Sequence, residues 1–115
     1  MRPWSRWLVV PVAAVGLVGG SVSAEGGFKN LQVLPKTIAK DQLKVVMKAQ
    51  AKALGVECDH CHEPPDMDKE TKNKKISREM MKMTQEINDR FLKGMDQKVT
   101  CDTCHRGKEK PEAAK

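Results

Sequence analysis

The feature that most constrains this chain is a short pattern, Cys-x-x-Cys-His, that occurs twice. The residues of the two copies are Cys58, Cys61 and His62 in the first, and Cys101, Cys104 and His105 in the second. Two thiols at this spacing reach the two vinyl groups on one edge of a haem, and the histidine that follows is then held as an axial ligand of the iron. The pattern is typical of c-type haem attachment. The sequence therefore predicts two covalently bound haem c groups.

Four cysteines also have other uses. They could form two disulfides in three different connectivities, or a single four-cysteine zinc site. The stretch from Cys61 to Cys101 is longer than the usual spacing between the two cysteine pairs of such a zinc site. Neither alternative requires a histidine directly after each cysteine pair. The two histidines therefore favour haem attachment over disulfides and zinc.

The N-terminal residues 1–24 have the pattern of a secretory signal peptide. A short basic start precedes an almost wholly apolar stretch at 7–18, and Val-Ser-Ala at 22–24 fits a signal-peptidase site. The apolar stretch is shorter than the ~20 residues that a membrane-spanning helix needs. We therefore predict export to the periplasm, which agrees with c-type haem attachment. An uncleaved N-terminal anchor, which would make the protein membrane-associated, is the alternative.

Composition limits both the partners and the core. Once the predicted signal peptide is removed, and Arg2 and Arg6 with it, the remaining chain has 19 basic and 15 acidic residues and a net charge of +4. In this remaining chain, Phe28 and Phe91 are the only Phe, Trp or Tyr residues. They are too few for stacking on bases, so we predict no nucleic-acid partner.

A chain of this size buries a modest core. Because it is also poor in bulky side chains, we expect the haems to supply much of its centre.

Hydrophobic periodicity predicts a first helix over residues 40–54. Its apolar positions share one face and are Leu43, Val46, Met47, Ala51 and Leu54. Gly55 is the expected C-cap. The first Cys-x-x-Cys-His motif begins three residues after this glycine.

A second helix is predicted from about Arg78 to Lys93, after a polar loop over 63–75. Ser77 is the expected N-cap, and Ile76 and Met81 are placed to form a hydrophobic staple around it. Gly94 is expected to end this helix, and the second motif follows.

The predicted fold is all-α, a small multihaem cytochrome c with two helix–turn–motif units packed around two haems and much irregular loop. Residues 25–107 would form this dihaem domain. Residues 108–115 are expected to be a disordered charged tail.

Each iron needs a sixth ligand, and methionine or histidine is the common choice. The only histidine outside the two ligand positions is His60, which sits inside the first motif and favours a solvent-facing place. Methionine is therefore preferred. Met47 lies on the apolar face of the first helix, and Met80 and Met83 face the core from the second. Periodicity alone leaves the choice between Met80 and Met83 open.

The chain resembles one half of the multihaem cytochrome subunit of photosynthetic reaction centres. The matching stretches run through most of the predicted domain and are Asn30–Pro35, Ala53–Val56, Ser77–Met80 and Val99–Gly107. The resemblance implies that the sixth ligand is a methionine on the helix before each motif. By position this is Met47 for the first haem and Met80 for the second, with Met83 as the less favoured alternative. The family subunit carries four haems, whereas this chain has motifs for two.

The predicted function is electron transfer. An exported dihaem cytochrome with His/Met-ligated irons would pass electrons between redox protein partners without binding a substrate at iron. A peroxidase-like haem enzyme with an open iron site, or a small electron-transfer subunit associated with a larger membrane redox complex, are the alternatives. Four lysines at i+4 spacing on the first helix form either a solvated face or a docking patch for an acidic partner: Lys40, Lys44, Lys48 and Lys52.

Overall fold

We describe the protein from a computed structural model, which places residues 27–113. The predicted signal peptide, 1–24, lies outside the described residues. The predicted tail, 108–115, lies partly outside them, and its disorder stays a prediction. Within residues 27–113 the regular structure is helical, and a single isolated bridge between Glu63 and Asp66 is the only β pairing. The prediction of an all-α fold with much irregular loop is confirmed.

Helix α1, Lys40–Leu54, has the predicted bounds. Asp41 in the first turn favours the positive end of the helix dipole. Gly55 ends the helix with φ at 66°, a left-handed conformation in which glycine has no steric penalty. Its amide N–H points back to the carbonyl oxygens of Ala51 and Lys52, which would otherwise lack partners.

Helix α2, Lys72–Glu86, begins earlier than predicted and continues into a π-helical turn, Ile87–Phe91. The N-cap is Thr71, whose hydroxyl oxygen accepts a hydrogen bond from the amide of Lys74 at 3.2 Å. The prediction that Ser77 caps this helix was therefore wrong. The first turn contains only polar residues. It therefore has no hydrophobic periodicity, and the sequence pattern predicted a loop there.

The predicted staple around Ser77 was wrong for the same reason, since Ile76 and Met81 both lie inside α2. Ile76 is exposed, and Met81 turns toward α1, where its sulfur accepts from Gln50 Nε2 at 3.4 Å. At its far end the helix stops after Phe91, slightly before the predicted Lys93.

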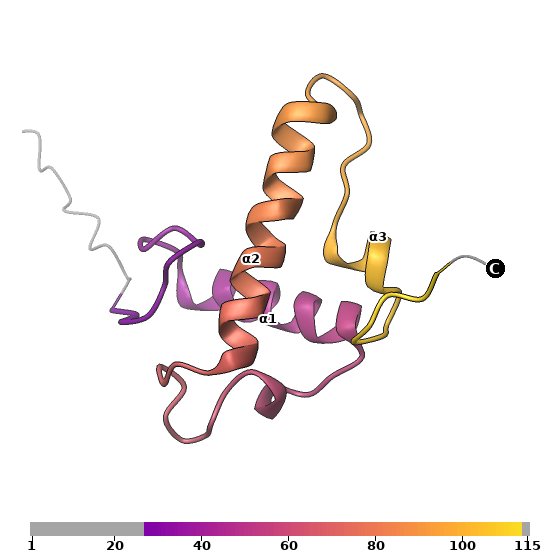
Figure 1. Cartoon of the computed structure of the whole chain (residues 1–115). Helices are drawn as coiled ribbons and strands as arrows, with labels where there is room; N and C mark the ends of the chain where they lie inside the picture. Colours follow the sequence, from indigo (N-terminus) through magenta and orange to yellow (C-terminus); the bar gives the residue numbers. More distant parts are fainter. Residues whose placement is uncertain (1–26, 114–115) are drawn as a thin grey trace, which may run out of the picture.

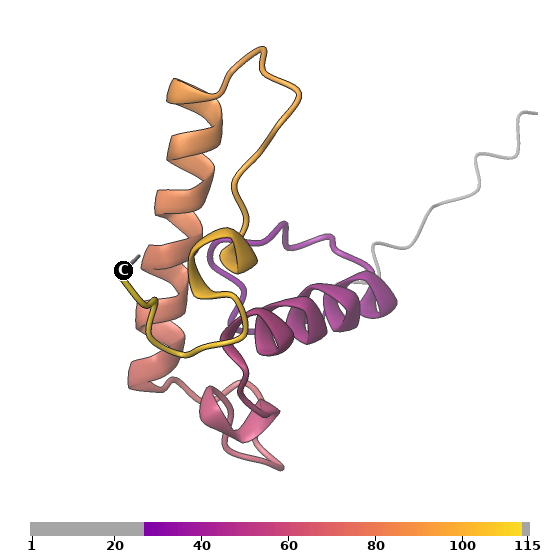
Figure 2. The same ribbon diagram turned by 90° about the vertical axis from the view of Figure 1, so that its right-hand side faces the viewer.

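Helix α3, Cys101–His105, consists of the second motif itself. The amide of its N-cap, Thr100, donates to Thr103 Oγ1 at 2.9 Å, which fixes the first turn. Figures 1 and 2 show α1 and α2 running at a large angle to each other, with α3 beside both. The chain therefore returns to the end of α1 through its second motif.

The end of α1 and the segment after α3 approach each other closely through their backbones. The amide of Gly107 donates to the carbonyl of Ala53 at 2.7 Å. A Cβ atom placed on Gly55 would lie 2.1 Å from the Gly107 carbonyl oxygen. Only glycine at position 55 lets these two segments meet, so the two helix–motif units interlock here.

Little of the apolar surface is buried by protein alone. Among residues 27–113, Ala53 is the only hydrophobic residue that is buried, at 4% exposure. Several large apolar side chains are exposed, and those on or just after α2 are Ile76, Met80, Met83, Phe91 and Met95. The protein side chains alone thus form a very small core, as the composition predicts.

Candidate cofactor sites

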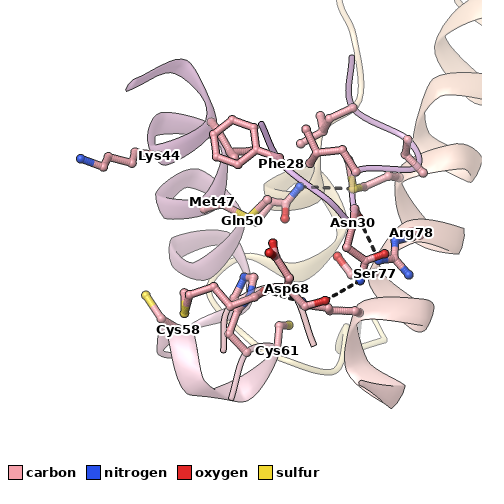
Figure 3. Close-up of a pocket in the computed structure, with 18 of the residues that line it drawn as sticks. Phe28, Asn30, Lys44, Met47, Gln50, Cys58, Cys61, Asp68, Ser77 and Arg78 are labelled. Carbon is pink, nitrogen blue, oxygen red and sulfur yellow. Dashed lines mark hydrogen bonds between the residues drawn. The ribbon is translucent and has the colours of Figure 1, made fainter. Parts of the chain in front are cut away.

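A cavity of about 440 Å³ lies between α1, the segment 28–34, the first motif and α2. Met47, Cys58, Cys61 and His62 all line it (Figure 3). Its volume is within the ~300–1,000 Å³ that is usual for small-molecule and cofactor sites. The remaining walls are largely apolar and include Phe28, Leu31, Val33, Leu34 and Leu43. The structure therefore brings together all four residues that were predicted for the first haem.

The ring of His62 has a defined orientation. Its Nδ1 lies 3.0 Å from the backbone carbonyl oxygen of Met67. Because a carbonyl oxygen can only accept, Nδ1 carries the hydrogen of the neutral ring and Nε2 keeps a free lone pair. A hydrogen bond of this kind on the second ring nitrogen is the usual support of a metal-ligating histidine.

Helix α2 holds the backbone of the first motif in place. Thr71 Oγ1 donates to the carbonyl of Cys61 at 2.8 Å, and Asn73 Nδ2 donates to the carbonyl of His60 at 2.7 Å. Burial raises the pKa of the Cys61 thiol, and the nearby Lys74 ammonium partly opposes that shift. The loop geometry is thus set by the start of α2, which sequence reasoning had assigned to loop.

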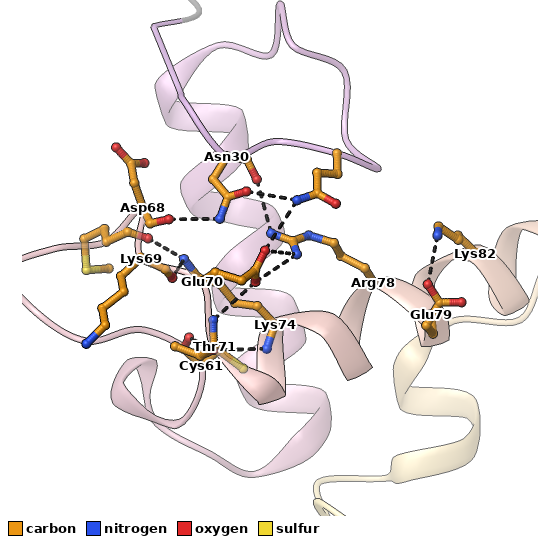
Figure 4. A network of polar contacts seen from close by, with 12 residues as sticks. Asn30, Cys61, Asp68, Lys69, Glu70, Thr71, Lys74, Arg78, Glu79 and Lys82 are labelled. Atoms are coloured by element: carbon orange, nitrogen blue, oxygen red, sulfur yellow. Dashed lines mark hydrogen bonds and ion pairs between the residues drawn. The ribbon is translucent and has the colours of Figure 1, made fainter.

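A polar network closes the cavity on the side of the N-terminal segment (Figure 4). Arg78 Nη1 contacts both carboxylate oxygens of Glu70, at 2.8 and 3.0 Å, and Nη2 donates to the carbonyl of Asn30 at 3.3 Å. Asn30 Nδ2 in turn donates to the carbonyl of Asp68 at 2.9 Å. The Arg78 side chain is only 13% exposed, and its hydrogen bonds lower the pKa of the Glu70 carboxyl.

The second motif has a similar histidine geometry. His105 Nδ1 lies 2.9 Å from the carbonyl oxygen of Lys108, so its Nε2 is also the nitrogen with a free lone pair. The loop before the motif is fixed to the π-helical turn after α2 by Asn88, whose amide group donates to the Val99 carbonyl at 2.9 Å and accepts from the Val99 amide at 2.8 Å. The start of α2 therefore supports the first motif, and the π-helical turn that continues it supports the second.

The predicted sixth ligands of the second haem, Met80 and Met83, both lie on α2, which is in contact with α3. Both side chains are partly exposed, at 42% and 46%. Their similar exposure favours neither, so the choice of Met80 over Met83 stays a prediction. Met81, between them in sequence, faces the first cavity instead. Of the three methionines on α2, only Met81 is therefore among the residues that line the first cavity.

Two residues of the first cavity, Gln50 and Met81, were missed as site residues by sequence reasoning. A signal for Met81 was present, because it lies about 100° around the helix from Met80 and must face another direction. The lysines of α1 also have an unexpected position: Lys40, Lys44 and Lys48 line the cavity, whereas Lys52 is not among its lining residues.

The profile of the family described as photosynthetic reaction centre cytochrome C subunit matches residues 6–114. The chain belongs to this family. A photosynthetic reaction center cytochrome c subunit from Rubrivivax gelatinosus is 30% identical over 106 residues, covering 89% of this chain and 28% of the relative. One from Roseobacter denitrificans is 31% identical over 103 residues, covering 81% and 28%. The chain spans less than a third of the length of these family members.

Membership of a cytochrome c family implies haem c, and the donor set fits that group. None of the four cysteines is in a disulfide, and each motif histidine keeps a lone pair on Nε2. The four cysteines do not gather into one site as the zinc alternative requires, since within residues 27–113 no three His, Cys, Asp or Glu side chains are placed to hold a metal ion.

In the same part of the chain, no helix has both the length and the apolar character needed to cross a membrane.

Proposed function

We propose that the protein is a dihaem c-type cytochrome that transfers electrons between redox partners. The observation that carries this proposal is the convergence of Met47, Cys58, Cys61 and His62 on one largely apolar cavity. Bound haem c supplies a one-electron ferric/ferrous couple. The protein's contribution is to hold the group, fill both axial positions and exclude water from the iron.

The roles of the first set of residues follow from their positions. Cys58 and Cys61 would hold haem c through two thioether bonds, and His62 would supply a nitrogen ligand to its iron. The carbonyl of Met67 orients the ring of His62 and leaves the lone pair of its Nε2 free for a metal. Met47, presented by α1, would supply the other protein ligand, and a methionine ligand raises the reduction potential relative to a second histidine.

The second set is assigned by the same logic. Cys101 and Cys104 would form the thioethers to the second haem, and His105, oriented by the Lys108 carbonyl, would be a ligand of its iron. Met80 on α2 is the proposed sixth ligand. Because α2 lines the first cavity and also contacts α3, the helix of the second motif, both haems would lie close to this helix. That closeness suits electron transfer between them within one small domain.

The proposed setting is the periplasm, reached through the signal peptide at 1–24, with an uncleaved anchor as the alternative route to the membrane. The named relatives are subunits of photosynthetic reaction centres. Association with a membrane redox complex is therefore our proposal for the partner.

The optical and magnetic spectra of the ferric protein test this function against a haem enzyme with an open iron site. We expect two low-spin haems, a methionine-to-iron charge-transfer band, and slow binding of cyanide. High-spin iron that binds cyanide or peroxide rapidly would contradict the proposal and favour a peroxidase-like enzyme.

A further inference from the structure

The cationic side chains around the first cavity fall into two groups. On α2, Lys74 Nζ donates to the carbonyls of Met67 and Lys69, both at 2.6 Å, and Arg78 is paired with Glu70. These two cations already have structural partners. On α1, the cavity is lined by Lys40, Lys44 and Lys48, whose side-chain ammonium groups make no hydrogen bond or ion pair within residues 27–113.

The position of the cysteines gives the cavity a direction. Cys58 and Cys61 follow the C-terminal end of α1, and Figure 3 shows them at the opposite end of the cavity from Lys44 and Phe28. A porphyrin joined to these cysteines through its vinyl edge carries its two propionates on the opposite edge. The propionates would therefore lie toward the N-terminal end of α1.

Lys40 and Lys44 are the lysines at that end. Lys40 precedes Met47, the proposed iron ligand, by seven residues, or roughly 10 Å along the helix axis. Lys44 precedes it by three residues, or roughly 4.5 Å. A flexible four-carbon stem lets each ammonium group reach a carboxylate beside the helix. Lys48 lies next to Met47, and Lys52 is further toward the cysteine end.

We propose that Lys40 and Lys44 bind the propionates of the first haem, an assignment that rests on the proposed dihaem function. All four lysines of α1 are exposed, but they then differ in role: Lys40 and Lys44 hold the cofactor, whereas Lys52 does not line the cavity. This differs from a single four-lysine patch for an acidic partner.

The test compares the holoprotein with the double variant Lys40→Gln/Lys44→Gln and with the matched control Lys52→Gln. The readout is the midpoint potential of each haem, measured by spectroelectrochemistry over a range of pH. Removing two cations near one haem favours its ferric form. We expect the double variant to shift that equilibrium by about tenfold, which corresponds to ~59 mV for a one-electron couple. The control should leave both potentials unchanged.

The pH dependence gives a second readout. A neighbouring ammonium lowers the pKa of a carboxylate, so losing it moves the titration of the propionates, seen as a pH-dependent potential, to higher pH. The variant Lys40→Arg/Lys44→Arg keeps both charges and should behave like the parent. If the double glutamine variant loses its first haem, each single glutamine variant serves in its place under the same criteria.

Unchanged potentials in the glutamine variants, or an equal shift in Lys52→Gln, would overturn the assignment. The proposed function is tested separately, because the intact mass of each variant reports the number of bound haems. A parent protein with fewer than two haems contradicts the function, whereas two haems with unresponsive potentials contradict only the role of these lysines.

Discussion

Replacing Gly55 by alanine tests the interlock between the two helix–motif units. The residue has φ at 66°, so any Cβ atom costs roughly 1–2 kcal/mol of backbone strain there. The new Cβ would also lie 2.1 Å from the Gly107 carbonyl oxygen, so the Gly107 segment must move. That movement breaks the 2.7 Å hydrogen bond from Gly107 to Ala53, worth ~1 kcal/mol. The free energy of unfolding should therefore fall by about 2–3 kcal/mol.

Thermal unfolding of the holoprotein, followed by far-UV circular dichroism, measures this loss. For a domain of this size each kcal/mol lowers Tm by ~4–8 °C, so we expect a decrease of roughly 10–25 °C. Gly94→Ala is the matched control, because Gly94 has φ at 83° but no atom within 4 Å of an added Cβ. It should show the strain alone, about 1–2 kcal/mol. Equal Tm values for the two variants would refute the argument from close approach.

Three further predictions concern the ligands and the polar network. Met47→Ala should remove about half of the methionine-to-iron charge-transfer absorbance and lower the potential of one haem, because thioether ligation raises it. Met80→Ala should remove the other half, whereas Met83→Ala should leave the spectrum unchanged. Glu70→Gln should weaken the acid dependence of stability in denaturant titrations. Arg78 lowers the folded-state pKa of Glu70, so its contribution is present above the unfolded pKa and is lost as pH falls through the folded pKa.

Each of these has a result that would contradict it. A full charge-transfer band in Met47→Ala would place another residue on the first iron. Loss of absorbance in Met83→Ala, with none in Met80→Ala, would exchange their roles. An unaltered acid limb for Glu70→Gln would show that the pair with Arg78 adds nothing to stability, as is common for exposed ion pairs.

The two helices show why sequence reasoning succeeded in one place and failed in another. α1 was predicted to its last residue because its apolar face and its glycine C-cap both leave local signals. The start of α2 was missed because its first turn is wholly polar. What stabilises that turn is the cap at Thr71 and the hydrogen bonds from Thr71 and Asn73 to the first motif, which are distant in sequence.

The residues of the candidate sites also differ in how visible they are in the sequence. Attachment residues are visible in sequence because haem chemistry demands a fixed local spacing. The walls of the first cavity are set by long-range packing. Gln50 and Met81 meet across two helices, and Asn30 reaches Arg78 from the N-terminal segment. Such contacts leave no local pattern in the sequence. That Lys40, Lys44 and Lys48 line the cavity and Lys52 does not is likewise visible only once α1 is placed against the first motif.

The most direct test of the account is the intact mass of the denatured, exported protein. Covalent attachment predicts a mass equal to the polypeptide plus two haems, retained under denaturing conditions. Substituting Cys58 and Cys61, or Cys101 and Cys104, by serine should each leave one haem. A mass equal to the bare polypeptide, or to the polypeptide less four hydrogens from two disulfides, would contradict the claim that both motifs attach haem.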